Sequence, residues 1–206
     1  MHNWSALSLF ASVAAVLVFT PGPNTLYIIA RSIQQGRRAG VVSSLGVQAG
    51  TLIHVAIAAL GLSALVVSSV AAFTVVKYAG AAYLVYLGLK TLLTKASLEP
   101  TKAIHYESLS RIFRQGMVVN LLNPKTALFF FAFLPQFIDP DRGAIAIQII
   151  VLGIILVFLG TTSYMLYALT AGSFGTWLRQ NSAFLPIQRY FASSVYIGLG
   201  ALIVLE

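Results

Sequence analysis

The amino-acid sequence predicts an all-α integral membrane protein whose six transmembrane helices form a three-plus-three inverted repeat. Of its 206 residues, 58% are hydrophobic and only 9% are charged, whereas soluble domains carry about 25% charged residues. Apolar runs long enough to cross a bilayer recur along the chain. Prolines interrupt two of these runs and predict that helices one and four are broken. Residues 1–206 are therefore expected to form a single transmembrane domain.

The first predicted repeat covers residues 5–94 and contains three spans. The first span, residues 5–31, has no basic leading region and is expected to be a retained helix that breaks at Pro21–Pro23, not a signal peptide. The second span, residues 41–68, and the third, residues 73–93, carry small residues that let neighbouring helices approach closely in lipid. The predicted helix-packing residues are Gly46, Gly50, Gly80 and Gly88.

The second predicted repeat, residues 112–206, follows a hydrophilic linker at residues 95–111. Its expected elements are span four at residues 113–137, broken at Asn123–Pro124, span five at 144–169, a Gly-Ser-Phe-Gly loop with Trp177 and Arg179, and span six at 186–205. The sequence Pro124-Lys125-Thr126 at this break resembles Pro23-Asn24-Thr25 at the first break. Because each half has an odd number of spans, the second half enters the membrane from the opposite side, which makes the repeat inverted.

Basic residues indicate the orientation, because cytoplasmic loops of membrane proteins are enriched in lysine and arginine. Lys77 and Arg142 fall on one side of the predicted topology. The other side holds Arg31, Arg37, Arg38, Lys90, Lys95, Lys102, Arg111, Arg114, Arg179 and Arg189. We expect this second side to be cytoplasmic and both termini to lie outside. The same asymmetry accounts for the net charge of +8 without nucleic-acid binding.

The first break is a candidate anion site. The helix that begins after Pro23 has free amides and a positive dipole end, which can hold a carboxylate. Thr20 or Asn24 can cap this end. The alternative is a purely structural kink, with neighbouring helices satisfying the freed backbone groups.

The second break carries Lys125, about 10 residues into span four, or roughly 15 Å at 1.5 Å per residue. This depth is close to the middle of a hydrocarbon core about 30 Å thick, where a lysine costs at least about 2.5 kcal/mol. The side chain should therefore face a cavity, where it either binds carbonyls of a broken helix or attracts a carboxylate. The predicted substrate-binding residues are Pro21, Gly22, Pro23, Asn24, Gln48, Asn120, Asn123, Pro124 and Lys125.

His54 lies near the centre of the second span. It is a candidate for proton coupling, because an unperturbed histidine titrates near pH 6.5. The alternative is a packed histidine that makes one hydrogen bond to a neighbouring helix.

Several kinds of chemistry find no support in the sequence. There is no cysteine, the three histidines are scattered, and no acid lies inside a predicted span, so neither a metal site nor a buried acid for a cation is expected. Phosphate loops, nucleophile elbows and paired carboxylates are missing from the sequence as well. We therefore expect neither enzymatic activity nor a cofactor.

The motifs of this chain resemble those of the LysE/RhtB family of amino-acid exporters. They are Thr20-Pro21-Gly22-Pro23-Asn24, Gly36-x-x-x-Gly40, Gly46-x-x-x-Gly50, Gly61, Lys77-Tyr78-Ala79-Gly80-Ala81-Ala82-Tyr83-Leu84-x-x-Leu87-Gly88 and Phe113-x-x-Gly116-x-x-x-Asn120-x-x-Asn123-Pro124-Lys125. The resemblance implies a secondary, proton-coupled efflux protein of the bacterial inner membrane, and the count of basic residues above then predicts periplasmic termini. The implied substrates are amino acids or derivatives such as homoserine, homoserine lactone or threonine.

One position departs from the family pattern. Where many relatives have an acid after the second glycine of helix two, this chain has Thr51. The departure gives His54 more weight as the proton carrier and favours neutral over cationic substrates.

The leading hypothesis is therefore an amino-acid exporter that works by proton antiport and alternating access in the lipid bilayer. The small-residue faces of its helices permit a homodimer but do not require one. The alternatives are an exporter of another small solute or cation, a membrane enzyme or quinone-binding protein, and a structural subunit.

Overall fold

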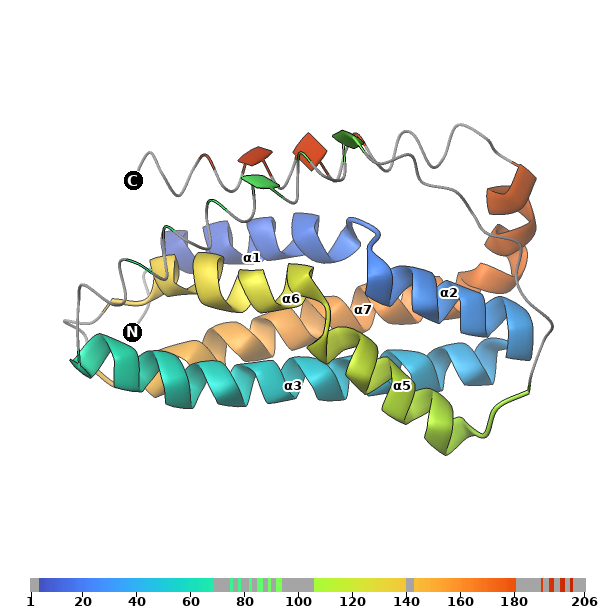
Figure 1. Ribbon diagram of the computed structural model, residues 1–206, viewed down its shortest axis with the longest axis horizontal. Helices are drawn as coiled ribbons and strands as arrows, with labels where there is room; N and C mark the ends of the chain where they lie inside the picture. The colour runs from blue at the N-terminus through green and yellow to red at the C-terminus, as the bar shows by residue number, and fades with distance from the viewer. Residues whose placement is uncertain are drawn as a thin grey trace.

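The computed structural model describes residues 4–68, 106–139 and 143–180, together with isolated positions between 75 and 93 and between 190 and 201. Over the described residues the regular elements are helices (Figure 1), as the sequence predicts. In chain order they are α1 (Trp4–Phe19), α2 (Pro23–Gln35), α3 (Arg37–Ser68), α5 (Leu109–Leu121), α6 (Pro124–Leu128), the π-helical η1 (Phe129–Phe133), the 3-10 helix η2 (Leu134–Phe137) and α7 (Ile145–Gln180).

Two unbroken helices are long and apolar enough to cross a membrane. They are α3, over Arg37–Gly61, and α7, over Ile145–Ala171, with mean hydropathies of 1.6 and 2.5. Two further spans are each formed by a bent helix pair: α1 with α2 bends by 48°, and α5 with the helices that follow it bends by 54°. Figure 1 shows α3 and α7 running along the whole bundle, while each bent pair changes direction midway. These are the predicted spans one, two, four and five.

The sequence predictions on spans three and six lie largely outside the described residues. Spans three and six are represented only by isolated positions, and Gly80 and Gly88 are not described. The division into two inverted repeats therefore stays a prediction.

The first break follows from Pro21 and Pro23, because neither residue has a backbone N–H to continue a helix. Helix α1 ends at Phe19, and α2 begins at Pro23, a position that suits a proline because the first turn needs no N–H donor there. Gly22 occupies the cap position with an extended backbone, and no side chain caps α2. The predicted break in helix one is confirmed.

The second break is organised by Asn123 and Pro124. Asn123 is the cap of α6, and its Oδ1 accepts a hydrogen bond of 3.0 Å from the backbone N of Lys125. Pro124 fills the first turn of α6. The predicted break in helix four is confirmed, but its continuation as a π-helix and then a 3-10 helix was not predicted.

The end of the fifth span differs from the sequence prediction. A loop was expected at residues 172–175, but α7 continues without interruption to Gln180. A glycine inside a helix costs only about 1 kcal/mol relative to alanine, so two glycines alone need not end one. Gly172 and Gly175 therefore do not end the helix.

Glycines allow α3 to lie directly against α5. A Cβ added to Gly46 would overlap the carbonyl oxygen of Phe113, and one added to Gly116 would lie 2.7 Å from the carbonyl oxygen of Ser43. A Cβ on Gly50 would lie 2.9 Å from the carbonyl oxygen of Met117. Such close backbone approach drives helix association in lipid, where apolar side chains gain little by leaving their surroundings.

An aromatic core joins α1 to the helical segments η1 and η2. Phe10 of α1 packs on Phe129, Phe133 and Phe137, with ring centroids 5.7, 6.4 and 5.2 Å away. Phe10, Phe129 and Phe133 are buried. This packing fixes the π-helical segment against α1 and so holds α6 in place.

We predict that Gly46→Ala destabilises the protein by about 1–3 kcal/mol, because the added methyl group must push α5 away from α3. The midpoint of thermal unfolding in detergent should fall. Gly61→Ala is the matched control, since a Cβ there has nothing within 4 Å. Equal midpoints for the two variants would contradict the close contact between α3 and α5.

Candidate functional site

A hydrogen bond joins the two helix breaks. Lys125 Nζ donates to the backbone oxygen of Thr20 over 2.6 Å. Thr20 lies just beyond the end of α1, where carbonyl groups lack intrahelical partners. Lys125 also lies against the backbone of the first break, since a Cβ on Gly22 would be 3.5 Å from its Cδ and 3.7 Å from its Nζ. The lysine of the second break therefore satisfies the carbonyl that the first break leaves free.

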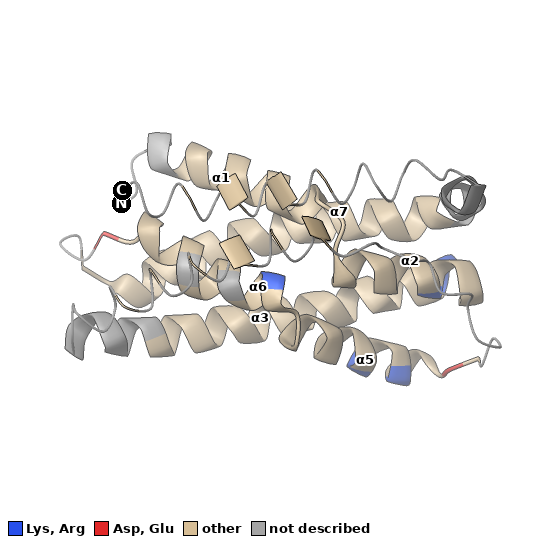
Figure 2. Ribbon diagram, turned by 45° about the horizontal axis from the view of Figure 1, so that its top comes forward, with Lys and Arg blue, Asp and Glu red and all other residues tan. Residues whose placement is uncertain are grey.

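The short helix α6, which carries Lys125, lies midway along the bundle (Figure 2). Figure 2 shows the blue segment of α6 midway along the bundle, whereas the blue segments of α2 and α5 lie nearer one end. Lys125 is half-buried. An ammonium group at this depth is tolerated only where protein or water surrounds it.

A cavity adjoins Lys125 between the broken spans and the two long helices. The cavity and its mouth together hold about 370 Å³. Its polar wall consists of Gln48, Thr51, Asn120, Lys125, Thr126 and Tyr164, and its remaining wall of Leu17, Val18, Phe129, Leu156 and Gly160. The lining therefore offers both polar and apolar contacts to a small molecule.

The structure brings most of the predicted substrate-binding residues to this region. Gln48, Asn120 and Lys125 line the cavity. Asn24 contacts its wall, because Asn24 Nδ2 donates to the hydroxyl of Tyr164 over 3.2 Å. The others shape the breaks: Pro21, Gly22 and Pro23 form the first, and Asn123 and Pro124 form the second.

His54 is not among the residues that line the cavity. Its Nε2 lies 3.4 Å from the backbone oxygen of Asn120, and its ring stacks on Phe130 with centroids 5.6 Å apart. This geometry is that of a packed histidine bonded to a neighbouring helix. It touches the cavity only through the backbone of Asn120.

Sequence reasoning missed the contribution of α7. Tyr164 and Gly160 line the cavity, and Thr161 and Val157 bind Gln48 from the same helix. The signal was present in the run Thr161-Thr162-Ser163-Tyr164, which places four hydroxyl groups in an otherwise apolar span. Thr126 was likewise visible as the third residue of the repeated Pro-x-Thr segment.

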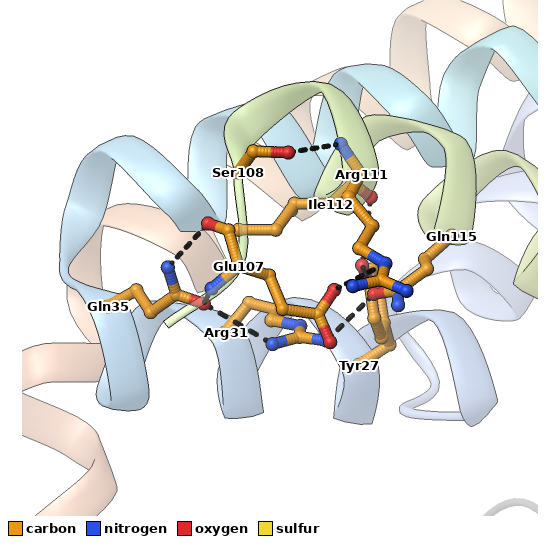
Figure 3. Close-up of polar contacts among 8 residues, drawn as sticks. All are labelled: Tyr27, Arg31, Gln35, Glu107, Ser108, Arg111, Ile112 and Gln115. Carbon is orange, nitrogen blue, oxygen red and sulfur yellow. Dashed lines mark hydrogen bonds and ion pairs between the residues drawn. The ribbon is translucent and has the colours of Figure 1, made fainter. Parts of the chain in front are cut away.

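A second polar cluster ties α2 to α5 at one end of the bundle (Figure 3). Arg31 Nη2 lies 3.2 Å from Glu107 Oε1 and donates to Gln115 Oε1 over 2.7 Å. Gln35 Nε2 donates to the backbone oxygen of Glu107 over 2.9 Å. The hydroxyl of Tyr27 donates to the backbone oxygen of Ile112 over 2.8 Å. We call these residues the Arg31–Glu107 cluster. The sequence predicts Arg31 only at the end of span one and Glu107 only in the linker, with no contact between them.

The arrangement of the described residues is typical of one class of membrane protein. Two proline-broken spans, tied by a buried lysine and enclosing a small cavity between long apolar helices, are typical of membrane transporters that bind cargo at mid-depth. The comparison with known families agrees. The LysE type translocator family matches residues 15–206, and the chain belongs to this family.

Three relatives illustrate the similarity. The chain is 34% identical to an uncharacterized membrane protein of Vibrio cholerae, with 98% of this chain and 97% of that protein covered. It is 32% identical to the uncharacterized membrane protein YrhP of Bacillus subtilis, with 97% of each covered. It is 30% identical to a homoserine/homoserine lactone efflux protein of Salmonella typhimurium, with 92% of this chain and 91% of that protein covered.

No solved structure matches the chain. The family match confirms the predicted resemblance and makes the protein a multi-pass membrane transporter. The roles of individual site residues stay predictions.

The Arg31–Glu107 cluster should contribute measurably to stability. We expect a double-mutant cycle of Arg31→Met and Glu107→Gln, read from unfolding free energies in detergent, to give a coupling of about 1.5–3 kcal/mol, the range of hydrogen bonds to charged groups. The side chains are only 13% and 19% exposed, so solvent screening is limited. Arg111→Met is the control, because that side chain is 67% exposed and lies 3.8 Å from Glu107. Purely additive effects of Arg31→Met and Glu107→Gln would contradict the coupling.

Proposed function

We propose that this protein is a secondary exporter of amino acids or their small derivatives, such as homoserine, homoserine lactone, threonine or similar neutral amino acids. It would act in the bacterial inner membrane by proton antiport and alternating access. The observation that carries the proposal is the ammonium group of Lys125, held on the Thr20 carbonyl at the wall of a cavity between two broken spans. The printed function of the Salmonella typhimurium relative supports the choice of substrate.

Lys125 is the proposed partner of the substrate carboxylate. A lysine ammonium has three N–H donors, and Thr20 takes one of them. The other donors are available to a carboxylate in the cavity. The uncapped start of α2 at Gly22 adds a positive dipole end beside the same ammonium.

The remaining wall supports a preference for neutral substrates. Among the described residues that line the cavity there is no aspartate or glutamate. A cationic side chain would therefore meet no opposite charge there, and burying it unpaired is costly. Leu17, Val18 and Leu156 instead offer apolar surface to a short neutral side chain.

Alternating access requires the cavity to open to each side in turn. The Arg31–Glu107 cluster joins the ends of α2 and α5 that lie away from the breaks. We propose that this end is cytoplasmic, from the distribution of basic residues, and that the cluster separates when the substrate enters. Lys125 or His54 would carry the exchanged proton, and both termini would lie in the periplasm. The small-residue faces are compatible with a homodimer.

The proposal is tested by counterflow in proteoliposomes that contain the purified protein. Labelled L-homoserine, L-threonine and L-leucine should exchange faster when the same unlabelled compound is on the opposite side, and an imposed pH gradient should drive net movement. Protein-free liposomes are the control. If no compound exchanges faster than in the control, the protein is not an exporter of neutral amino acids.

Lys125→Ala should reduce the exchange rate at least about tenfold, since it removes a charge-assisted hydrogen bond to the substrate. The control is Arg114→Ala, which removes an exposed basic side chain near the start of α5 and should leave the exchange rate near that of the parent. Both variants should insert at parental levels, as measured by quantification in isolated membranes. Undiminished exchange by Lys125→Ala would remove this residue from the mechanism.

A further inference from the structure

Two buried side-chain oxygens beside the cavity have no hydrogen-bond partner among the described residues: Asn120 Oδ1 and Asn24 Oδ1. Asn120 itself lines the cavity and is only 1% exposed. An unpaired buried carbonyl oxygen costs about 1–3 kcal/mol. Native proteins retain such a group mainly where a ligand or water satisfies it.

The orientation of the Asn120 amide follows from a chain of hydrogen bonds that begins on α7. The carbonyl oxygen of Val157 can only accept, so the group 2.6 Å from it must be the NH₂ of Gln48. Gln48 Nε2 also lies 2.7 Å from Thr161 Oγ1, whose own hydrogen is directed to Val157 at 2.7 Å. The amide of Gln48 is therefore fixed with its oxygen toward Thr51.

The hydrogen bonds of Thr51 in turn fix the orientation of the Asn120 amide. Its hydroxyl has a single hydrogen and lies 3.1 Å from Gln48 Oε1 and 3.3 Å from the backbone oxygen of Val47. Both of these oxygens are acceptors, so the hydroxyl donates its one hydrogen to one of them. Thr51 Oγ1 must then accept from its third neighbour, which is Asn120 Nδ2 at 3.2 Å.

The unpaired atom of the Asn120 side chain is therefore the acceptor Oδ1, because Nδ2 already donates to Thr51. Asn24 is not constrained in this way, because its neighbour is the hydroxyl of Tyr164, which can donate or accept. The argument therefore depends on Asn120 alone.

We infer that Asn120 Oδ1 accepts a hydrogen bond from the α-ammonium group of the substrate, and that Thr51 and Gln48 are positioning residues that hold it in this orientation. The inference rests on the proposed function and assigns the second end of the same ligand. Lys125 takes the carboxylate, or the ester carbonyl of a lactone, and Asn120 the ammonium group, so the site selects molecules that carry an α-ammonium group beside a carboxylate or ester. A neutral acceptor also binds an ammonium group more weakly than a carboxylate does, which permits its release on the far side.

The test is a comparison of two ligand pairs that differ only in the amino group: L-homoserine with 4-hydroxybutyrate, and L-leucine with 4-methylpentanoate. Binding is measured by calorimetry on the purified full-length protein in detergent. The parent should bind each amino acid about 10- to 100-fold more tightly than its deamino analogue, the range expected for one charge-assisted hydrogen bond. In Asn120→Ala the two affinities should differ by less than about threefold, with the affinity for the deamino analogue unchanged.

Thr51 variants test the positioning role and decide the matter if Asn120→Ala does not fold. Thr51→Val keeps the shape but removes the acceptor, so discrimination between amino acid and analogue should fall. Thr51→Ser restores the hydroxyl and should restore discrimination. Thr162→Val is the matched control, because that hydroxyl is exposed on α7 and donates only within its own helix.

The outcomes separate the two proposals. Parental discrimination in Asn120→Ala or in Thr51→Val would overturn the inference. A parent protein that binds both members of each pair equally would also overturn it, while leaving an exporter of carboxylates intact. A parent protein that binds neither member of either pair would count against the proposed function itself, and the inference would fail with it.

Discussion

The hydrogen bond between Lys125 and the Thr20 carbonyl is the interaction on which the rest of the site depends. Each partner alone would be costly in a membrane: an ammonium group at mid-depth and a helix-end carbonyl without a donor. Together they satisfy one another across residues far apart in the chain. The bond also holds the two broken spans at a fixed separation, and the cavity occupies the space that this separation leaves.

The breaks could be predicted because they are local properties of the chain. A proline lacks an N–H donor wherever it occurs. The face that α7 turns toward α3 is different, because only tertiary packing decides that Val157, Thr161 and Tyr164 meet Gln48 and Asn24. The sequence therefore indicated three of the six polar residues that line the cavity, namely Gln48, Asn120 and Lys125.

Charges at the ends of the spans were harder to interpret. In the sequence, Arg31 is one of many basic residues that indicate orientation, and Glu107 is part of a hydrophilic linker. Their pairing depends on the angle at which α2 leaves the first break and α5 approaches the second. The end of α7 was also mispredicted: composition suggested a loop at Gly172, but glycines lower helix stability only slightly, and α7 continues to Gln180.

The packing of Gly50 against Asn120 has an evolutionary consequence. A Cβ on Gly50 would lie 2.8 Å from the Cβ of Asn120 and 2.9 Å from the carbonyl oxygen of Met117. Every residue except glycine keeps a Cβ at position 120, so a descendant that acquired alanine at position 50 would have to move α5, and the Asn120 amide with it. The proposed ligand contact of Asn120 and the fit between the two helices are thus inherited together.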